Sequence, residues 1–267
     1  MSAILVIGAH LDECEYGAGG ISRKFAKLGY EVTFLNTVGT DYDVTIFSDD
    51  KEKQKTFLQQ AEEAAQILGA RKFVLKYPDK CFPANDLQVV SDIAKVVKEV
   101  NPQIVLIQWV KDHHHDHVRT ARASLEALTE VNRFTGGKPI ELNLKEIYAY
   151  EAGTTQTVDF EPDFYVNITE EIEEVFSSFR KFKALGKEPL VDEKRVQARY
   201  RGMQSGFKYA EAFKFIGPWA PLKSLLADLF GKDVRPAGST LYPWGCLLYT
   251  SDAADEGLGV DLGGRRI

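Results

Sequence analysis

All five histidines of this 267-residue chain lie in two short segments. His10 is followed by Asp12, Glu13 and Glu15, and residues 113–117 read HHHDH. Imidazole nitrogens and carboxylate oxygens are ligands that Zn²⁺ takes in catalytic sites, where one coordination position stays open for water. A second source of histidine would complete a three-ligand site, and a carboxylate left off the metal could take a proton from the bound water. Such a donor set also accepts other divalent ions, Fe²⁺ among them.

Each segment alone has a simpler interpretation. A His-x-Asp-Glu sequence in a loop is typical of a capped turn, and clustered histidines occur in solvated loops or fortuitous surface metal sites. The joint placement favours a functional site, because each segment directly follows an apolar run that is typical of a buried strand. These runs are residues 3–8 and residues 104–109.

Strand-like and helical patterns alternate along the first part of the chain. The predicted strands are residues 3–8, 32–35, 73–75 and 104–109, and the predicted helices are residues 21–28, 51–68 and 87–100. This alternation indicates βαβ units and a parallel sheet. We therefore expect an α/β fold, a single Rossmann-like three-layer domain with a mainly parallel sheet. Its site is expected at the carboxyl ends of the strands, where such sheets bind ligands.

The remaining segments are expected to complete this site. Residues 9–20 are predicted to form a loop after the first strand. Beyond residue 140 the pattern predicts a strand at 146–150 and helices at 169–183, 192–213 and 221–230, which would supply one wall of the site.

Several segments resemble the PIG-L family, also called LmbE-like, of zinc-dependent N-acetyl-sugar deacetylases. Residues 9–20 read AHLDECEYGAGG, where the family signature is A-H-P-D-D-x-E-x-G-x-G-G. Residues 114–117 read HHDH and are similar to the second signature, H-P-D-H. The later segments FEPDFYVNIT (160–169), RG (201–202) and YAEAF (209–213) also resemble the family. The resemblance spans about residues 3–215.

The resemblance implies a role for each residue of the two signatures. The metal ligands for Zn²⁺ would be His10, Glu13 and His117. Asp12 would be the general base that acts on zinc-bound water. His114 would stabilise the tetrahedral oxyanion or protonate the leaving amine. Asp116 would hydrogen-bond a histidine and fix its tautomer. The implied activity is hydrolysis of the N-acetyl amide of an N-acetylglucosamine-type substrate.

The chain departs from the family pattern in ways that bear on this site. Leu11 and His115 each replace a proline, and Glu13 replaces the aspartate expected on zinc. The extra methylene of Glu13 moves its carboxylate by roughly 1.5 Å. The loop therefore adjusts, or Glu15 contributes, or the affinity and metal choice differ. Residues 57–60 read FLQQ, on a helix that carries a substrate-binding arginine in many relatives.

The composition limits the classes of partner that the protein is expected to bind. The net charge of −6 argues against nucleic acid, because no basic stripe is present to neutralise phosphates. The longest apolar runs are too short for a membrane span, and the N-terminus lacks the pattern of a signal peptide. Three cysteines do not make a disulfide framework. We expect a cytoplasmic protein that acts on a small amino-sugar conjugate, and a homo-oligomeric assembly stays open.

The end of the chain has an unusual sequence. Residues 246–267 read CLLYTSDAADEGLGVDLGGRRI, which matches the translation of a transposon-end adapter used in sequencing libraries. We therefore expect this tail to lie outside the fold and Cys246 to have no chemical role. Residues 1–235 would form the deacetylase domain, and residues 236–245 an uncertain end of the natural sequence.

Two other functions remain compatible with the sequence. The first is a different metal-dependent amidase that acts on another amide. The second is a non-catalytic, Rossmann-like module that binds a carbohydrate or nucleotide without metal, with Glu13 marking a decayed site. Metal content of the purified protein separates the second from the enzymes.

Overall fold

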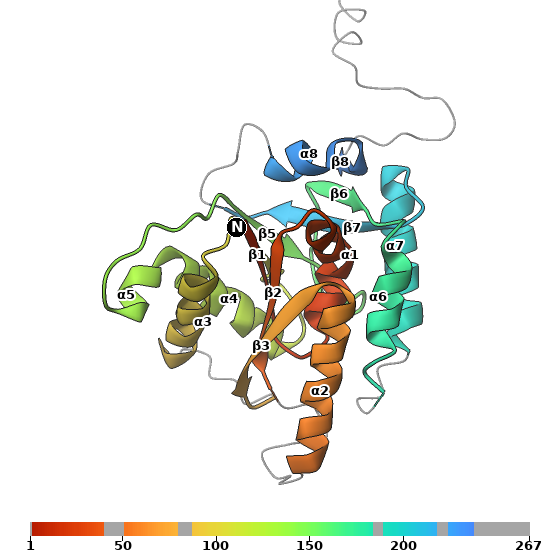
Figure 1. Ribbon diagram of the computed structural model, residues 1–267. Coiled ribbons are helices and arrows are strands. Elements are labelled where there is room, and N and C mark those ends of the chain that lie inside the picture. The colour runs from red at the N-terminus through yellow and green to blue at the C-terminus, as the bar shows by residue number, and fades with distance from the viewer. Residues whose placement is uncertain (1, 40–50, 80–86, 184–188, 218–223, 238–267) are drawn as a thin grey trace, which may run out of the picture.

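The apolar runs of the sequence form one sheet in the computed structural model, which describes residues 2–39, 51–79, 87–183, 189–217 and 224–237 (Figure 1). The strands are β1 (Ala3–Gly8), β2 (Glu31–Val38), β3 (Ala70–Tyr77), β4 (Ile104–Gln108), β5 (Glu146–Tyr150), β6 (Phe164–Asn167), β7 (Ala210–Phe215) and β8 (Val234–Pro236). Their order across the sheet is β3-β2-β1-β4-β5-β7-β6-β8. Strands β1 to β5 run parallel, and β7, β6 and β8 are joined by antiparallel pairing. The predicted, mainly parallel sheet is confirmed.

Helices cover both faces of this sheet and give the predicted three layers (Figure 1). One face is covered by α1 (Glu13–Lys27), α2 (Lys51–Ile67), α6 (Ile172–Phe179) and α7 (Leu190–Ser205). The other is covered by α3 (Leu87–Val100), α4 (His115–Thr129) and α5 (Val131–Thr135). The short helix α8 (Leu225–Phe230) precedes β8. Alternate residues of β1 enter the two cores, Val6 the first and Ile7 the second, as the two-residue period of a strand requires.

The strand order places two chain segments side by side that are far apart in sequence. β1 lies between β2 and β4, so the chain leaves β1 toward one side and returns on the other. In open α/β sheets this reversal opens a crevice at the carboxyl ends of the strands. The backbone N–H of Ala9 donates to Oε1 of Gln108 at 2.8 Å and joins the two strand ends directly. The segments that follow β1 and β4 therefore meet, as predicted.

The prediction of a loop over residues 9–20 is wrong from Glu13 onward, because α1 begins there. The glycines of this segment serve close packing. A Cβ added at Gly17 would lie 1.9 Å from the ring of Tyr150, so only glycine lets the helix approach β5. The consequence is that Glu13 sits in the first turn of a helix rather than in a loop.

The predicted helix over residues 192–213 is confirmed up to Ser205 and wrong beyond it. Helix α7 ends at Ser205, and Gly206 follows with a φ of +76°, a left-handed conformation that favours glycine. Residues 210–215 then form strand β7. The predicted helix at 169–183 is shorter, since α6 covers only Ile172–Phe179. Helix α4, which the sequence analysis did not predict, begins within the histidine run.

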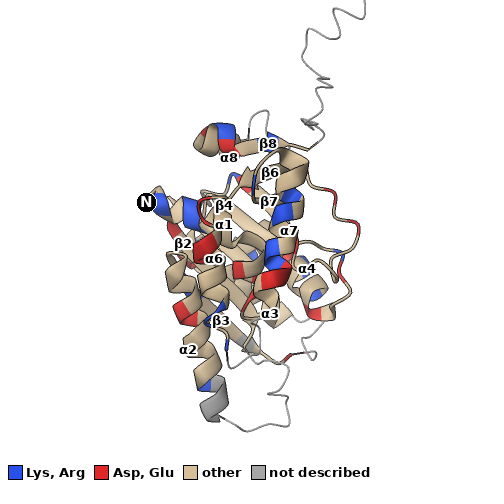
Figure 2. Ribbon diagram, turned by 90° about the vertical axis from the view of Figure 1, so that its right-hand side faces the viewer, with Lys and Arg blue, Asp and Glu red and all other residues tan. Residues whose placement is uncertain are grey.

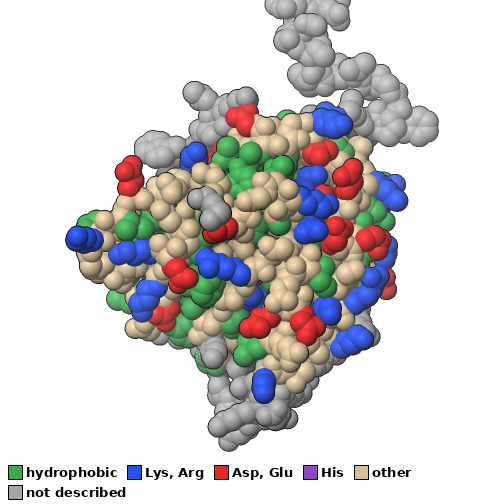
Figure 3. All heavy atoms as spheres, in the orientation of Figure 1, with side chains coloured by type: hydrophobic (Ala, Val, Ile, Leu, Met, Phe, Trp, Pro, Cys, Tyr) green, Lys and Arg blue, Asp and Glu red, His purple; other side chains and the backbone are tan. Residues whose placement is uncertain are grey.

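Outside the core, charged side chains of both signs are interspersed on the face shown in Figure 3, and both signs occur along α7 (Figure 2). Among the described helices, none is long and apolar enough to span a membrane. The tail 246–267, Cys81 and most of residues 236–245 lie outside the described residues.

Candidate metal centre

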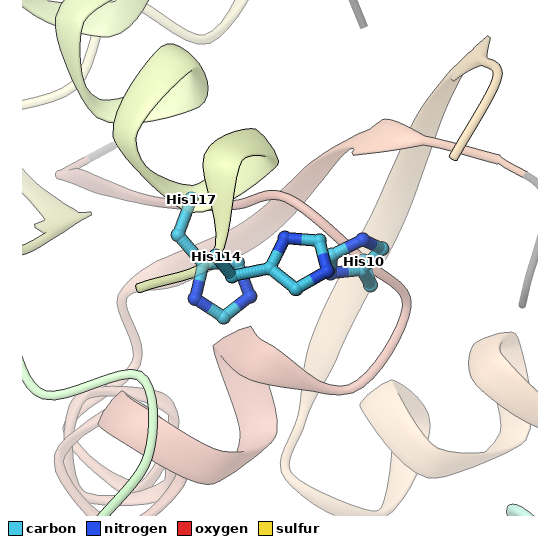
Figure 4. Close-up of side chains that lie close together, drawn as sticks. All are labelled: His10, His114 and His117. Carbon is cyan, nitrogen blue, oxygen red and sulfur yellow. The ribbon is translucent and has the colours of Figure 1, made fainter. Parts of the chain in front are cut away.

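The two histidine segments converge on one point beside the ends of β1 and β4 (Figure 4). His10 lies in the turn after β1, His114 is the N-cap residue of α4, and His117 lies in the first turn of that helix. The ring centroid of His114 is 4.7 Å from those of both His10 and His117. One nitrogen from each of the three rings lies within 4.8 Å of the others. The structure thus brings together histidines separated by more than a hundred residues.

Glu13 joins these two segments through a single carboxylate. Its Oε1 lies 2.7 Å from Nδ1 of His10 and 3.1 Å from Nε2 of His117, while Oε2 accepts the backbone N–H of His10. The Glu13 residue is only 7% exposed. The longer side chain that replaces the family's aspartate therefore reaches both imidazoles from the first turn of α1.

The charges at this point favour a cation. Burial alone would lower the pKa of His10, but Glu13, Asp116 and Asp79 raise it well above its usual value. Burial likewise opposes the shift at His117, where Glu13 and Asp112 raise the pKa to about 9. Burial would raise the pKa of Glu13, yet the two imidazoles hold it well below its usual range. Protons on these rings occupy positions for which a divalent ion would compete.

The second nitrogen of each ring faces another carboxylate. Nδ1 of His117 lies 3.2 Å from Oδ1 of Asp112. Nε2 of His10 lies 3.1 Å from Oδ1 of Asp79 and 3.5 Å from Oδ2 of Asp116. Carboxylates in this position orient metal-binding histidines and select the tautomer. The expected role of Asp116 fits this contact with His10.

Asp79 and Asp112 were not singled out from the sequence. A usable signal existed for both, since each is a carboxylate shortly after a strand whose carboxyl end lies at the site. Asp79 follows β3 by two residues, and Asp112 follows β4 by four. Neither lies within the two signature segments, residues 9–20 and 114–117.

Asp112 is held firmly from two directions. Its Oδ1 accepts the backbone N–H of His114 at 2.7 Å, and its Oδ2 accepts the hydroxyl of Thr157 at 3.2 Å. An antiparallel bridge also pairs Asp112 with Thr157. The segment after β5 thus packs against the histidine run, which supports the expectation that residues beyond 140 form a wall of the site.

His114 has the geometry of a neutral hydrogen-bond donor. Its Nδ1 accepts the backbone N–H of Asp116 at 3.3 Å, so the proton of a neutral ring is on Nε2. Burial lowers the pKa of His114, and the charges on His10 and His117 lower it further. The ring is therefore neutral at pH 7 and presents an N–H.

Asp12 occupies the N-cap position of α1, directly before Glu13. It is 5% exposed. The helix N-terminus favours a negative charge at this place. The described residues form two clusters of potential ligands, His10 with His114 and His117, and His10 with Asp79, His114 and Asp116. The remaining histidines of the run, His113 and His115, are exposed and belong to neither cluster.

Glu15 pairs with Lys72 and is not among the carboxylates that contact the histidines. Its Oε1 lies 2.7 Å from Nζ of Lys72 on β3, and both side chains are fully buried. Burial raises the pKa of Glu15 to about 7, although Lys72 opposes the shift. Lys72 also donates to the backbone oxygen of Leu11 at 2.6 Å, so it fixes the turn where the family has proline. Phe57, from the stretch that lacks the arginine, is buried in the core.

The donor chemistry fits a divalent metal ion. The imidazoles of His10 and His117 both contact the carboxylate of Glu13, and their opposite nitrogens face further carboxylates. The ring of His114 also lies within the same group of potential ligands. This set matches the nitrogen and oxygen ligands of three-residue catalytic sites. The identity of the ion does not follow from the donor set, because such sites bind several metals.

We expect Asp112→Asn to weaken metal binding by about 10- to 100-fold. The amide keeps the shape of the side chain but loses the charge that supports the Nδ1–H of His117. A competition titration with a chelating dye measures the change. Asp159→Asn, at an exposed aspartate, serves as the control and should bind like the parent. Equal affinities for the two variants would show that Asp112 does not tune His117.

The chain is similar to known proteins in sequence and in fold. Residues 5–128 match the model of the PIG-L family, described as GlcNAc-PI de-N-acetylase. The diacetylchitobiose deacetylase of Thermococcus kodakarensis is 27% identical over 229 residues, which are 80% of this chain and 82% of that protein. The N,N'-diacetylchitobiose deacetylase of Pyrococcus horikoshii has a similar structure, with a TM-score of 0.67 and 23% identity over 80% of this chain and 84% of that one.

The same fold also carries another reaction. GalB of Pseudomonas putida, a 4-carboxy-2-hydroxymuconate hydratase, superposes with a TM-score of 0.64 at 21% identity, covering 84% of this chain and all of that one. A fold therefore does not decide the reaction, and the side chains of the site must carry the functional argument.

Proposed function

This chain belongs to the PIG-L family, and we therefore propose that it is a metal-dependent hydrolase that removes the N-acetyl group from an N-acetylglucosamine-type substrate. One observation carries the proposal: a single carboxylate oxygen of Glu13 contacts an imidazole from each signature, His10 and His117. The names of the family and of the Thermococcus relative, which both refer to N-acetylated amino sugars, support the substrate class.

We propose Zn²⁺ as the ion, held by His10, Glu13 and His117. Nδ1 of His10 and Nε2 of His117 would bind, since these are the nitrogens that face Glu13. When bound, such an ion supplies a Lewis acid that polarises the amide carbonyl and lowers the pKa of water. Asp79, Asp116 and Asp112 would keep the opposite nitrogens of the two rings protonated.

Asp12 would take the proton from the attacking water. Asp12 is buried and directly precedes Glu13 in the sequence. Carboxylates act as general bases at this kind of centre. Its side chain can move that proton toward the amine that leaves when the C–N bond breaks. Acetate and the free amino sugar are the products.

His114 would stabilise the negative charge on the carbonyl oxygen during attack. Its Nδ1 is occupied by the backbone N–H of Asp116, so its Nε2–H is available as a donor. A neutral, preoriented donor of this kind lowers the barrier by a few kcal/mol. This geometry favours the oxyanion role over protonation of the leaving amine.

The proposed function is tested by acetate release. Metal-loaded protein should hydrolyse N,N'-diacetylchitobiose or an N-acetylglucosamine conjugate faster than simple acyl amides, because hydroxyl groups of the sugar add binding energy that orients the amide. Equal rates on both classes would favour a general amidase. Absence of bound metal together with absence of acetate would favour a binding module. The cytoplasmic location and a homo-oligomeric assembly stay predictions.

A further inference from the structure

Helix α1, which carries Glu13, is broken in the middle. Ala18 has non-helical backbone angles, with φ of −140° and ψ of 20°, so the helix consists of two segments that meet at a kink. The first segment, residues 13–17, follows the turn that holds His10 and Asp12. A break interrupts the helical hydrogen-bond ladder, and the polar groups on either side need other partners.

Glu211 of β7 supplies the acceptors after the break. Its Oε1 accepts the backbone N–H of Gly20 and its Oε2 that of Ile21, both at 2.9 Å. A carboxylate at the start of a helical segment satisfies free N–H groups and complements the positive end of the helix dipole. Glu211 belongs to the YAEAF segment, which the proposed mechanism leaves without a role.

Lys194 of α7 supplies the donor before the break. Its Nζ donates to the backbone oxygen of Tyr16 and to Oε1 of Glu211, the latter at 3.0 Å. Both charged side chains are 1% exposed. One buried ion pair therefore spans the kink. Lys194 contacts the backbone of the first segment, and Glu211 contacts the backbone at the start of the second.

We propose that Lys194 and Glu211 are positioning residues for the metal centre. This inference rests on the proposed function, because it treats Glu13 as a metal ligand. The pair fixes the angle at which the first segment leaves the kink, and that angle decides whether Glu13 reaches both His10 and His117. Glu211 of the YAEAF segment and Lys194 of α7 thus act on the centre through the backbone of α1, without touching the ion or the substrate.

A purely structural role and a positioning role for this ion pair predict different experimental results. Removing one partner of any buried pair destabilises the fold, so a loss of thermal stability does not distinguish the two roles. A positioning pair also changes the affinity for Zn²⁺ and the turnover number of the folded protein. The KM for the amide should stay unchanged, because neither side chain contacts the substrate.

The experiment compares Glu211→Gln and Lys194→Met with the parent, at a temperature where unfolding curves show each protein to be folded. We expect the dissociation constant for Zn²⁺, measured by competition with a chelating dye, to rise about tenfold or more. We also expect kcat to fall without a change in KM. Lys24→Met is the matched control, since it removes an ion pair with Asp233 from the same helix beyond the kink. It should bind Zn²⁺ like the parent.

A conservative variant covers the case in which these proteins do not fold. Glu211→Asp keeps the charge but withdraws the carboxylate by about 1.5 Å, so it should fold and bind Zn²⁺ more weakly. Unchanged Zn²⁺ affinity and kcat in the folded variants would overturn the positioning role. If the parent itself binds no Zn²⁺, the proposed function fails instead, so the two failures are distinguishable.

Discussion

Purified His117→Ala should contain no stoichiometric metal and should release acetate at least about 1,000-fold more slowly than the parent. His117 is the proposed ligand from the first turn of α4, and its ring contacts both Glu13 and Asp112. Without it, two of the three proposed ligands remain, too few for a three-residue catalytic site. A bound ion contributes several kcal/mol to amide hydrolysis, and each 1.4 kcal/mol is a factor of ten in rate. Elemental analysis and kcat/KM measure the two effects.

His115→Ala provides the matched control for this result. His115 comes from the same run of histidines but is exposed and outside both clusters of potential ligands. It should retain metal and activity, although it replaces a family proline and lies two residues before the predicted ligand His117. If removing His115 empties the site while removing His117 does not, the assignment of ligands from the second signature is wrong.

Asp12→Asn should keep the metal and lose about 10²- to 10⁴-fold in kcat. The amide has the size of the carboxylate but cannot accept a proton from water, so it removes the base without removing a metal ligand. The expected separation of metal content from rate distinguishes this variant from His117→Ala. Thermal unfolding should confirm that the buried substitution leaves the protein folded at the assay temperature.

The result that would contradict this role is an Asn variant with the parent's kcat. The proton would then go to another carboxylate at the centre, and Asp79 would be the first to test because it lies 3.1 Å from His10. A variant that loses metal together with activity would indicate instead that Asp12 binds the ion.

Much of the parallel half of the fold was predictable from sequence. The runs 3–8 and 104–109 are almost continuously apolar, which is typical of strands buried on both faces, and both became neighbouring strands. The position of the site followed from the same reasoning, since the two histidine segments come directly after these strands. The resemblance to the PIG-L family implied that His10, Glu13 and His117 share a metal; the structure places their side chains in contact, and their role as ligands stays a prediction.

The rest depended on tertiary contacts that no local pattern reveals. The first turns of α1 were predicted to be a loop, and Gly17 lies where the ring of Tyr150 packs against the helix. Strand β7 follows α7 so closely that its apolar residues continued the helical pattern, and only Gly206 marked the boundary. Asp79 and Asp112 could be recognised as site residues only from their contacts with the imidazoles of His10 and His117.

The hydrogen bond between Ala9 and Gln108 has a consequence for how the protein acquires its ion. In zinc fingers the metal gathers ligands that are otherwise scattered, and the apoprotein is unfolded. Here the ladder between β1 and β4 already holds the two ligand-bearing turns together. A slip of one residue between those strands would displace them by about 3.3 Å. The proposed ion would therefore bind to turns that the sheet already aligns, and we expect its removal by a chelator to leave the fold intact.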